Sequence, residues 1–139
     1  MSEGEDVFFG LSIPFLRLLG VQAEHAGGGS SRISLDPRPE LMNSFGVSHG
    51  GVIMTMLDVA MAIASRGMRG HPGGVMTVEM SVSFLRSARG RIVAEGKVLR
   101  GGRSLFFCEG TAFDENGEMV AKSLGTFKLR KEMKEGEGN

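Results

Sequence analysis

One fifteen-residue window constrains the fold of this chain more than any other feature. Residues 51–65, GVIMTMLDVAMAIAS, hold a single charged side chain, Asp58, and are rich in Ala, Met and Leu, which favour helix. A helix that is apolar on every side is expected to be buried. In a chain of 139 residues, only an enveloping sheet can bury a helix that completely. The window therefore predicts a central helix, ended by Arg66, Gly67 and the Pro-Gly stretch at 71–74.

The residues after this helix predict four successive strands. Apolar and polar residues alternate over 76–84, which indicates a half-buried strand with Thr77 and Glu79 on its polar face. Further strands are expected at 92–98, 105–113 and 119–129, with a hairpin loop at Arg100–Arg103 and an Asn-Gly turn at 114–117. Because hairpins dominate this half of the chain, the sheet is expected to be mostly antiparallel.

The residues before the central helix predict a short helix and one more hairpin. The helix is expected over 8–19, with Pro14 near the start of its second half and Gly20 as its stop. Strands at 21–25 and 30–35 follow, separated by a triple-glycine turn, and then a loop at 37–48. The whole predicts one α+β domain over residues 1–139, a curved sheet around one long helix, with a disordered tail at 130–139.

Composition excludes some function classes. Lys+Arg and Asp+Glu number 16 each, so the basic excess of a nucleic-acid-binding protein is missing, while self-association is compatible with a net charge of zero. The single cysteine, Cys108, cannot form an intrachain disulfide and is expected to be a small core residue. Residues 1–6 lack the basic start of a signal peptide, and the apolar window is too short to span a bilayer comfortably. A cytoplasmic protein without a membrane partner is expected.

The segment Asn43–Gly51 leads directly into the central helix and is the first candidate for chemistry. Gly50 and Gly51 expose backbone N–H groups without side chains in the way. First-turn N–H groups have no intrahelical partner, and the macrodipole is positive at this end, which suits a developing oxyanion. The alternative is a loop that needs glycine for its geometry. His49 is equally a candidate functional residue or a helix cap.

Asp58 is the second candidate, because an ionised carboxylate in an apolar helix is costly to bury unless it is paired or solvated. A functional carboxylate and one that anchors a neighbouring backbone segment remain equally open. Asp58 lies eight residues after Gly50, which is about 12 Å along a helix. It therefore cannot act on a carbonyl held at the start of its own helix, but it can reach that site on a second, antiparallel copy. If both features belong to one site, the protein is at least a dimer.

The remaining candidates carry weaker signals. The Arg100–Arg103 hairpin is either a phosphate-binding loop of cations and bare N–H groups or a plain turn. Solvent or interface exposure explains Glu79, and we assign no function to His25 or His71. No spacing of residues resembles a metal site.

The pattern Asn43-x-x-Gly46-x-x-His49-Gly50-Gly51, followed by Asp58, resembles the phenylacetate-degradation-type (PaaI-like) family of hotdog-fold acyl-CoA thioesterases. The resemblance covers about residues 10–129. It implies a hotdog fold, a homotetramer built as a dimer of dimers, and no metal or cofactor other than the coenzyme A of the substrate. The expected substrate is a small aromatic or medium-chain acyl-CoA. Because the chain has no Tyr or Trp, an aromatic acyl pocket would rely on Phe.

The resemblance also implies a role for each matching residue. The Gly50 N–H would polarise the thioester carbonyl, and Asp58 of the partner chain would be general base or nucleophile. Asn43 and His49 would orient the water and the loop, and Thr77 falls where relatives carry Ser or Thr near the carboxylate. The residues expected to contact coenzyme A are Gly51, Arg100, Gly102, Arg103 and Ser104.

Two other functions remain open. A hotdog hydratase or dehydratase would use His49 and Asp58 as its His and its acid, although the Asn43-to-Asp58 spacing argues against this. A non-catalytic module would hold acyl-CoA without turnover, which the presence of Asp58 disfavours.

Overall fold

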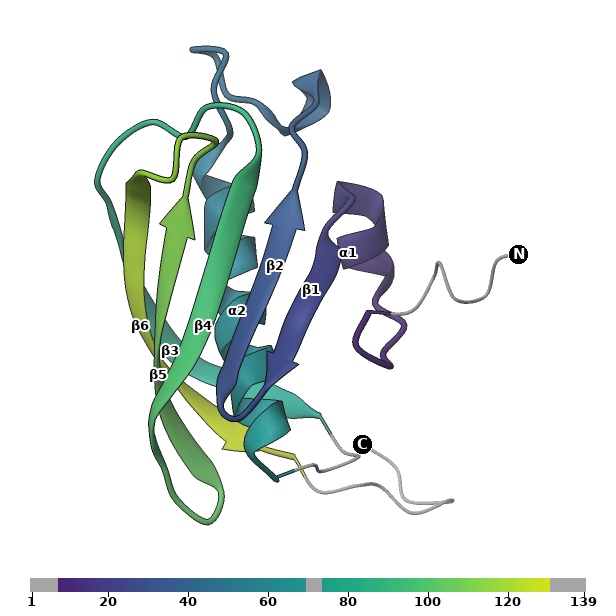
Figure 1. The fold of residues 1–139 in the computed structure, drawn as a ribbon, viewed down its shortest axis with the longest axis vertical. Helices are drawn as coiled ribbons and strands as arrows, with labels where there is room; N and C mark the ends of the chain where they lie inside the picture. Colours follow the sequence, from purple (N-terminus) through teal and green to yellow (C-terminus); the bar gives the residue numbers. More distant parts are fainter. Residues whose placement is uncertain (1–7, 70–73, 131–139) are drawn as a thin grey trace.

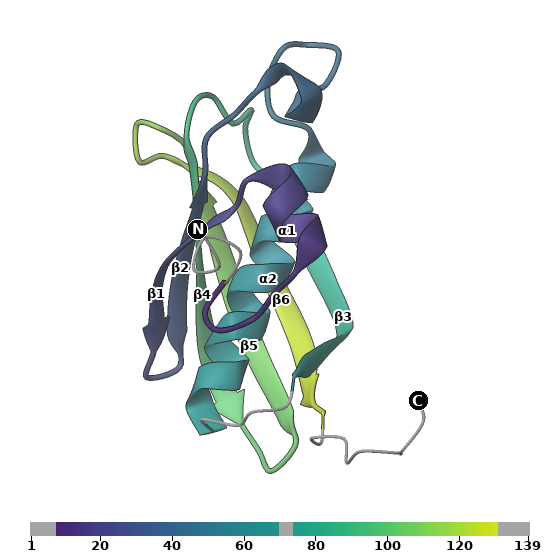
Figure 2. The ribbon, with the colours of Figure 1, turned by 90° about the vertical axis from the view of Figure 1, so that its right-hand side faces the viewer.

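The computed structural model describes residues 8–69 and 74–130. The expectations about the acidic N-terminus, His71 and the charged tail fall on residues outside this description. Within it, one antiparallel sheet of six strands curves around a long helix, which confirms the α+β hotdog fold (Figure 1, Figure 2). The strands, in the spatial order β1-β2-β4-β5-β6-β3, are β1 Gln22–Gly27, β2 Ser30–Leu35, β4 Ile92–Gly101, β5 Leu105–Phe113, β6 Met119–Leu129 and β3 Val75–Phe84. The helices are α1 Pro14–Leu19, the short 3₁₀ helix η2 Pro39–Leu41, and α2 Gly50–Arg69.

The N-terminal helix is shorter than expected. It begins at Pro14, whereas residues 8–11 form a bridged turn. Proline at the first helical position lacks only an N–H that has no helical partner, so it starts this helix instead of lying inside it. Gly20 ends the helix in the left-handed conformation with φ 84°, as expected. The predicted hairpin between β1 and β2 and the turn before β6, with Gly117 at φ 78°, are confirmed.

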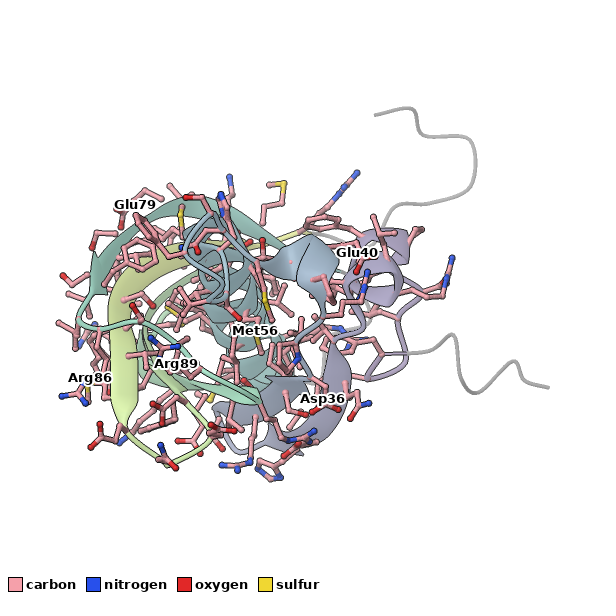
Figure 3. The ribbon with its side chains drawn as sticks, turned by 90° about the horizontal axis from the view of Figure 1, so that it is seen from above. Asp36, Glu40, Met56, Glu79, Arg86 and Arg89 are labelled. Atoms are coloured by element: carbon pink, nitrogen blue, oxygen red, sulfur yellow. The ribbon has the colours of Figure 1, made fainter. Side chains whose placement is uncertain are left out.

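The central helix is longer than expected and does not end at Arg66 or Gly67. Its inner face is buried inside the curve of the sheet, where Figure 3 shows Met56. A set of five residues has no exposed surface: Met56, Leu57, Ala60, Met61 and Ala64. By length and composition Gly50–Met68 would suffice to cross a membrane, but half of this stretch is buried within the protein as its core helix.

One side of α2 stays uncovered, contrary to the expectation of complete burial. Gly51 and Met54 are exposed, and Thr55, Asp58 and Ala62 are half-buried. These residues recur every three to four positions and therefore form one stripe along the helix. The edge strand β3 is the last strand of the sheet on this side, so no further strand covers the stripe. We refer to these five residues as the open stripe.

Glycine fixes how closely α2 approaches the sheet. A Cβ atom on Gly96 of β4 would lie 2.2 Å from the carbonyl oxygen of Ala60, so no larger residue fits there. The Ser31 hydroxyl on β2 donates a hydrogen bond to the same carbonyl at 2.5 Å. These contacts hold the middle of α2, which carries Asp58, at a fixed position over the sheet.

A bulge in the edge strand β3 changes which side chains face the helix. The register with β6 shifts between Thr77 and Glu79, which leaves Val78 as the extra residue. Thr77 pairs with buried Phe127, so it lies on the helix side and not on the polar face predicted from alternation. Glu79 lies on the outer face, where its carboxylate accepts a hydrogen bond from Thr126. The expected apolar face is also poorly covered, since Met76, Val78 and Phe84 are 45%, 55% and 51% exposed.

Candidate active site

Asp58 and Thr77 meet between α2 and β3. The Thr77 hydroxyl donates a hydrogen bond of 2.6 Å to Oδ1 of Asp58. A hydrogen bond to an ionised acceptor is short and strong, so this contact fixes the orientation of the carboxylate. Asp58 is half-buried on the open stripe, and its Oδ2 has no hydrogen-bond donor among residues 8–69 and 74–130. The carboxylate is therefore held in place with one oxygen available to a ligand or a water molecule.

His49 caps the start of α2. Its Nδ1 accepts the Gly51 N–H at 2.8 Å, and its carbonyl oxygen accepts the Val52 N–H at 2.9 Å. Because Nδ1 is an acceptor here, the neutral ring carries its proton on Nε2. The Gly51 N–H is therefore occupied, whereas the Gly50 N–H has no acceptor within the described part of the chain. Gly50 is the donor that this helix end offers to a ligand.

Asn43 shapes the loop in front of the helix. Its Oδ1 accepts the N–H groups of Phe45 at 2.8 Å and Val47 at 3.3 Å, and its own N–H donates to the Val47 carbonyl at 2.8 Å. Gly46 takes the left-handed conformation at φ 77°, which the tight turn requires. Asn43 thus orders the loop, and its side-chain NH₂ group has no acceptor among the residues described.

Two cavities flank this end of α2. The first, about 360 Å³, has Asn43, Gly50, Ile53 and Phe84 among its lining residues. Its wall also includes Ser48, whose hydroxyl is buried without a hydrogen-bond partner in the described structure. The second, about 340 Å³, opens on the other side of the helix between α1 and α2. The first cavity therefore contains the only candidate oxyanion donor that the described helix end leaves without an acceptor.

Sequence reasoning missed the contact between Phe84 and Gly50. The ring atoms Cε1 and Cζ of Phe84 lie 3.4 and 3.5 Å from the position that a Cβ atom of Gly50 would occupy. This contact joins the end of β3 to the start of α2, and no local pattern in the sequence reports it.

The predicted coenzyme A hairpin lies at the other end of α2. A Cβ on Gly101 would lie 3.8 Å from Cε of Met68, which is in the last turn of the helix. In Figure 1 the β4–β5 hairpin and the loop that precedes α2 lie at opposite ends of the molecule. Arg100 and Arg103 are exposed. The strand continues through Gly101, so the turn is shorter than expected, and the Gly102 N–H is already bonded to the Leu105 carbonyl at 2.7 Å.

The backbone carbonyl of Ser104, a further predicted coenzyme A residue, accepts a hydrogen bond from the Leu129 N–H at 2.7 Å.

The candidate residues fall into three groups along one chain: the start of α2, the Asp58–Thr77 pair, and the hairpin. Asp58 is eight residues from Gly50, about 12 Å along the axis. A single chain brings Asp58 and Thr77 together but does not bring this pair to Gly50.

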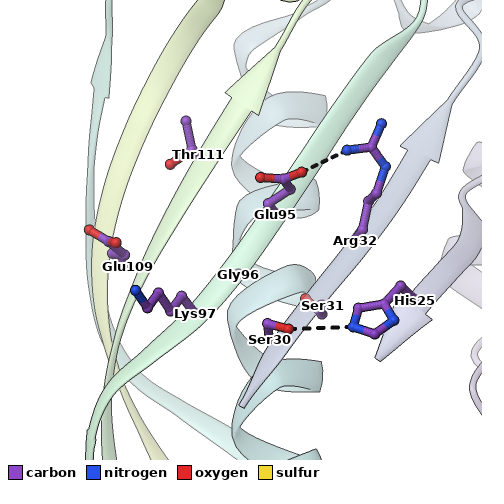
Figure 4. Close-up of a pocket in the computed structure, with 9 residues that line it drawn as sticks. All are labelled: His25, Ser30, Ser31, Arg32, Glu95, Gly96, Lys97, Glu109 and Thr111. Carbon is purple, nitrogen blue, oxygen red and sulfur yellow. Dashed lines mark hydrogen bonds and ion pairs between the residues drawn. The ribbon is translucent and has the colours of Figure 1, made fainter. Parts of the chain in front are cut away.

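A third cavity, about 340 Å³, lies on the outer face of the sheet (Figure 4). Its lining includes Arg32, which is paired with Glu95 at 2.6 Å and with Glu24 at 2.9 Å. Lys97 and His25 also lie there. None of the predicted site residues lines this cavity, and the charges on Arg32 and Glu95 already satisfy each other.

Comparisons with known proteins identify the family of the chain. The sequence profile of a family described as the thioesterase superfamily matches residues 45–121, which are more than half of the chain and include the helix start, Asp58 and Thr77. A Saccharolobus solfataricus protein that carries a provisional esterase name is 30% identical over 82% of this chain and 76% of its own length. The medium/long-chain acyl-CoA thioesterase YigI of Salmonella typhimurium is 25% identical, over 83% of this chain and 84% of its own.

Solved structures show the same fold. A conserved protein of Pseudomonas aeruginosa superposes with a TM-score of 0.81 at 25% identity, over 94% of this chain and 100% of its own. A mutant of the phenylacetic acid degradation protein PaaI of Thermus thermophilus gives 0.75 at 23% identity, over 85% of this chain and 99% of its own. At that identity the likeness to PaaI extends to the fold alone.

Proposed function

The chain belongs to the thioesterase superfamily, and from this premise we propose that it hydrolyses the thioester bond of an acyl-CoA. The substrate that we propose carries a small aromatic or medium-chain acyl group. The name of the YigI relative supports coenzyme A as the thiol. Membership of the PaaI-like subgroup, suggested by the Asn43-to-Asp58 pattern, is part of the proposal.

The observation that carries the proposal is the hydrogen bond from Thr77 to Asp58. Thioester hydrolysis needs one base and one stabilised oxyanion. An oriented carboxylate with an available oxygen supplies the base: it takes a proton from water as the water attacks the carbonyl carbon. The tetrahedral intermediate then expels the thiolate, which leaves as the free thiol once protonated. Direct attack by Asp58, with a mixed anhydride that water hydrolyses, uses the same geometry.

The Gly50 N–H is the proposed oxyanion donor. It has no acceptor in the described structure and points from the positive end of a twenty-residue helix. A donor aimed at a developing oxyanion contributes about 10²–10³-fold in kcat in other enzymes. In this scheme the His49 cap holds the Gly51 N–H in the helix start, and Asn43 keeps the loop in shape around the substrate.

Two chains are required to complete the proposed site. The open stripe on α2 and the exposed edge strand β3 leave apolar surface uncovered next to Asp58. A two-fold partner with its α2 antiparallel covers this surface and brings the Asp58 of one chain to the Gly50 of the other. The same operation brings the Arg100–Arg103 hairpin at the end of one helix to the start of the other, where the phosphates of coenzyme A would bind. We propose a homodimer as the catalytic unit and a dimer of dimers as the assembly.

The test is release of free thiol from a panel of saturated, unsaturated and aromatic acyl-CoAs. A thioesterase releases thiol from a saturated acyl-CoA, whereas a hydratase changes only an unsaturated chain and a binding module releases nothing. Binding of the same acyl-CoAs is measured alongside. Tight binding without thiol release from any member of the panel would refute the proposal.

A further inference from the structure

We propose that Phe45 is the platform on which the adenine ring of coenzyme A stacks. This inference rests on the proposed function and deepens it, because it adds an aromatic contact for the nucleotide to the phosphate contacts proposed for the Arg100–Arg103 hairpin. Phe45 occupies a free position of the pattern Asn43-x-x-Gly46, so neither the pattern nor the resemblance that rests on it gives this residue a role.

The first step is exposure. Phe45 is 85% exposed, more than any other large apolar residue in the described parts of the chain. Burial of a phenylalanine ring stabilises a folded protein, and at this position nearly all of that gain is absent. A single exposed apolar residue needs no explanation by itself. Two further observations distinguish Phe45: its turn is ordered, and the turn borders the proposed active site.

The second step is the order of the turn. The Phe45 N–H donates to Oδ1 of Asn43 at 2.8 Å, and the Gly46 N–H donates to the Asn43 carbonyl at 3.1 Å. The Asn43 N–H in turn donates to the Val47 carbonyl at 2.8 Å. These bonds fix the backbone on both sides of the ring. A ligand that binds to a ring held in this way orders little of the protein, which favours binding.

The third step is the position of the turn. Asn43 and Val47, on either side of Phe45, line the same cavity as Gly50. The loop that carries them lies at the start of α2, at the end of the molecule opposite the β4–β5 hairpin of the same chain (Figure 1). In the proposed two-fold arrangement the hairpin of the partner meets this end of α2. The Phe45 ring and the partner's cations therefore face the same substrate molecule.

The fourth step identifies the part of the substrate that the ring contacts. Phe45 lines neither of the two cavities that flank this end of α2, so it lies outside the space next to the carbonyl. A part of the substrate remote from the thioester meets it there. Adenine is the one flat aromatic group of coenzyme A, and stacking of a base on an aromatic side chain corresponds to a factor of about 5 to 150 in affinity.

Phe45→Trp gives a direct optical test, because the chain has no Trp and no Tyr. Stacking of adenine on the indole should quench its fluorescence, so coenzyme A and adenosine bisphosphate should both lower the emission. Pantetheine, which lacks the base, should leave the emission unchanged. Phe15→Trp, on α1 at a residue 53% exposed, is the control and should respond to none of them. Quenching by pantetheine, or constant emission at saturating coenzyme A, would overturn the inference, as would absence of coenzyme A binding in calorimetry.

Thiol release measures what the contact contributes to the reaction. The acyl group that the panel shows to be hydrolysed fastest is compared as its coenzyme A ester and as its pantetheine ester, so that contacts with the acyl group cancel. Phe45→Leu should lower kcat/KM for the coenzyme A ester about tenfold, mainly through KM, and leave the pantetheine ester unchanged. Phe45→Tyr, which keeps the ring, should retain the native ratio. Phe15→Leu, the same change at another exposed phenylalanine, should also leave the ratio unchanged.

The outcomes separate this inference from the proposed function. An equal loss on both esters in Phe45→Leu would show that the ring contacts the pantetheine or the acyl group, and would overturn the inference while the proposed function stands. A lower native mass of Phe45→Leu by light scattering would show that the ring contacts a second copy of the chain, and overturns it too. Absence of thiol release from every acyl-CoA overturns the proposed function, whereas the fluorescence of Phe45→Trp still decides whether adenine stacks there.

Discussion

Thr77 and Asp58 are joined by a 2.6 Å hydrogen bond because β3 carries a bulge between Thr77 and Glu79. Without the extra residue Val78, Thr77 would share a face with Glu79 and point away from α2. The bulge turns one polar side chain of an otherwise alternating strand toward the helix. The proposed catalytic carboxylate is therefore oriented by an irregularity of the sheet.

This relationship predicts the behaviour of two substitutions at Thr77. Thr77→Val keeps the shape and removes the donor, and since hydrogen bonds to charged groups contribute about 1.5–3 kcal/mol, kcat is expected to fall at least about tenfold. Thr77→Ser keeps the hydroxyl and should restore most of the activity. KM should change little in both variants, because the proposed contact orients Asp58 and does not bind substrate. Equal activity of the Val and Ser variants in a thiol-release assay would contradict a role in orientation.

Asp58→Asn is expected to lower kcat more than about 100-fold, because a positioned base typically contributes 10²–10⁴-fold. Asn is nearly isosteric and its Oδ1 can still accept the Thr77 hydrogen bond, so the fold should survive. The melting temperature should hold or rise, since the change removes a carboxylate from an apolar helix. If Asp58 has only a structural role, the melting temperature falls and the folded fraction keeps its rate. Both quantities are measured on one preparation.

Much of the fold follows from periodicity alone. The last strand, Met119–Leu129, has the predicted bounds, and α2 is where its composition places it. These elements are set by local sequence, because alternation and helix propensity act over a few neighbouring residues. The extension of α2 through Gly67 could not be read in this way. A Cβ there would lie only 3.9 Å from the backbone of Gly27, so this helical glycine lies against the β1–β2 turn.

The candidate site was predicted only in part, for a related reason. Gly50 and Asp58 stand out locally, as an unpartnered helix start and as the one charge in an apolar window. The side of β3 that Thr77 faces depends on its register with β6, and the contact of Phe84 with Gly50 depends on how the strand end meets the helix start. Neither the face of Thr77 nor the contact of Phe84 can be predicted from the alternation of apolar and polar residues along the chain. The expectation that α2 is fully enclosed was wrong, because the sheet ends at β3 and leaves one stripe of the helix uncovered.

The Arg100–Arg103 hairpin is expected to affect substrate binding more than turnover. Both side chains are exposed, and replacing both with Ala should raise KM for acyl-CoAs more than it lowers kcat, since contacts remote from the carbonyl act mainly as uniform binding. The effect should shrink at high salt. Lys97→Ala, which removes an exposed cation from the outer sheet face, is the control. An unchanged KM at low salt in the double variant would remove this hairpin from the coenzyme A site.

The ion-pair network on the outer face predicts a pH-dependent contribution to stability. Hydrogen bonds from Ser34, Arg32 and Arg91 hold the pKa of the Glu24 carboxyl below its usual value of 4.5. A lowered pKa in the folded state means that the contribution is present above pH 4.5 and is lost as the pH falls through the lowered value. Glu24→Gln should therefore be less stable than the native protein at neutral pH, by about 1 kcal/mol or less for exposed pairs, and the difference should shrink in acid. Denaturant midpoints at pH 7 and in acid check this.

Complementation between two inactive variants tests the shared active site. Gly50→Pro removes the proposed donor, and proline is tolerated at the first position of a helix. This variant and Asp58→Asn should each be inactive alone. A mixed dimer would combine Gly50 of one chain with Asp58 of the other in one of its two sites. Unfolding and refolding an equal mixture should therefore restore about a quarter of the native activity, because half of the two-fold dimers are mixed and each has one intact site.

The same mixture separates a shared site from a site within one chain. If Gly50 and Asp58 of the same chain worked together, every chain would carry one defect and co-refolding would restore nothing. Native mass by light scattering must show a species of at least twice 14.8 kDa in the active fraction. Refolding each variant alone gives the baseline, and mixing without unfolding shows whether subunits exchange. Activity that stays at the baseline in a correctly assembled mixture would contradict the cross-chain arrangement, since the separation of about 12 Å along α2 allows the two groups to meet only between chains.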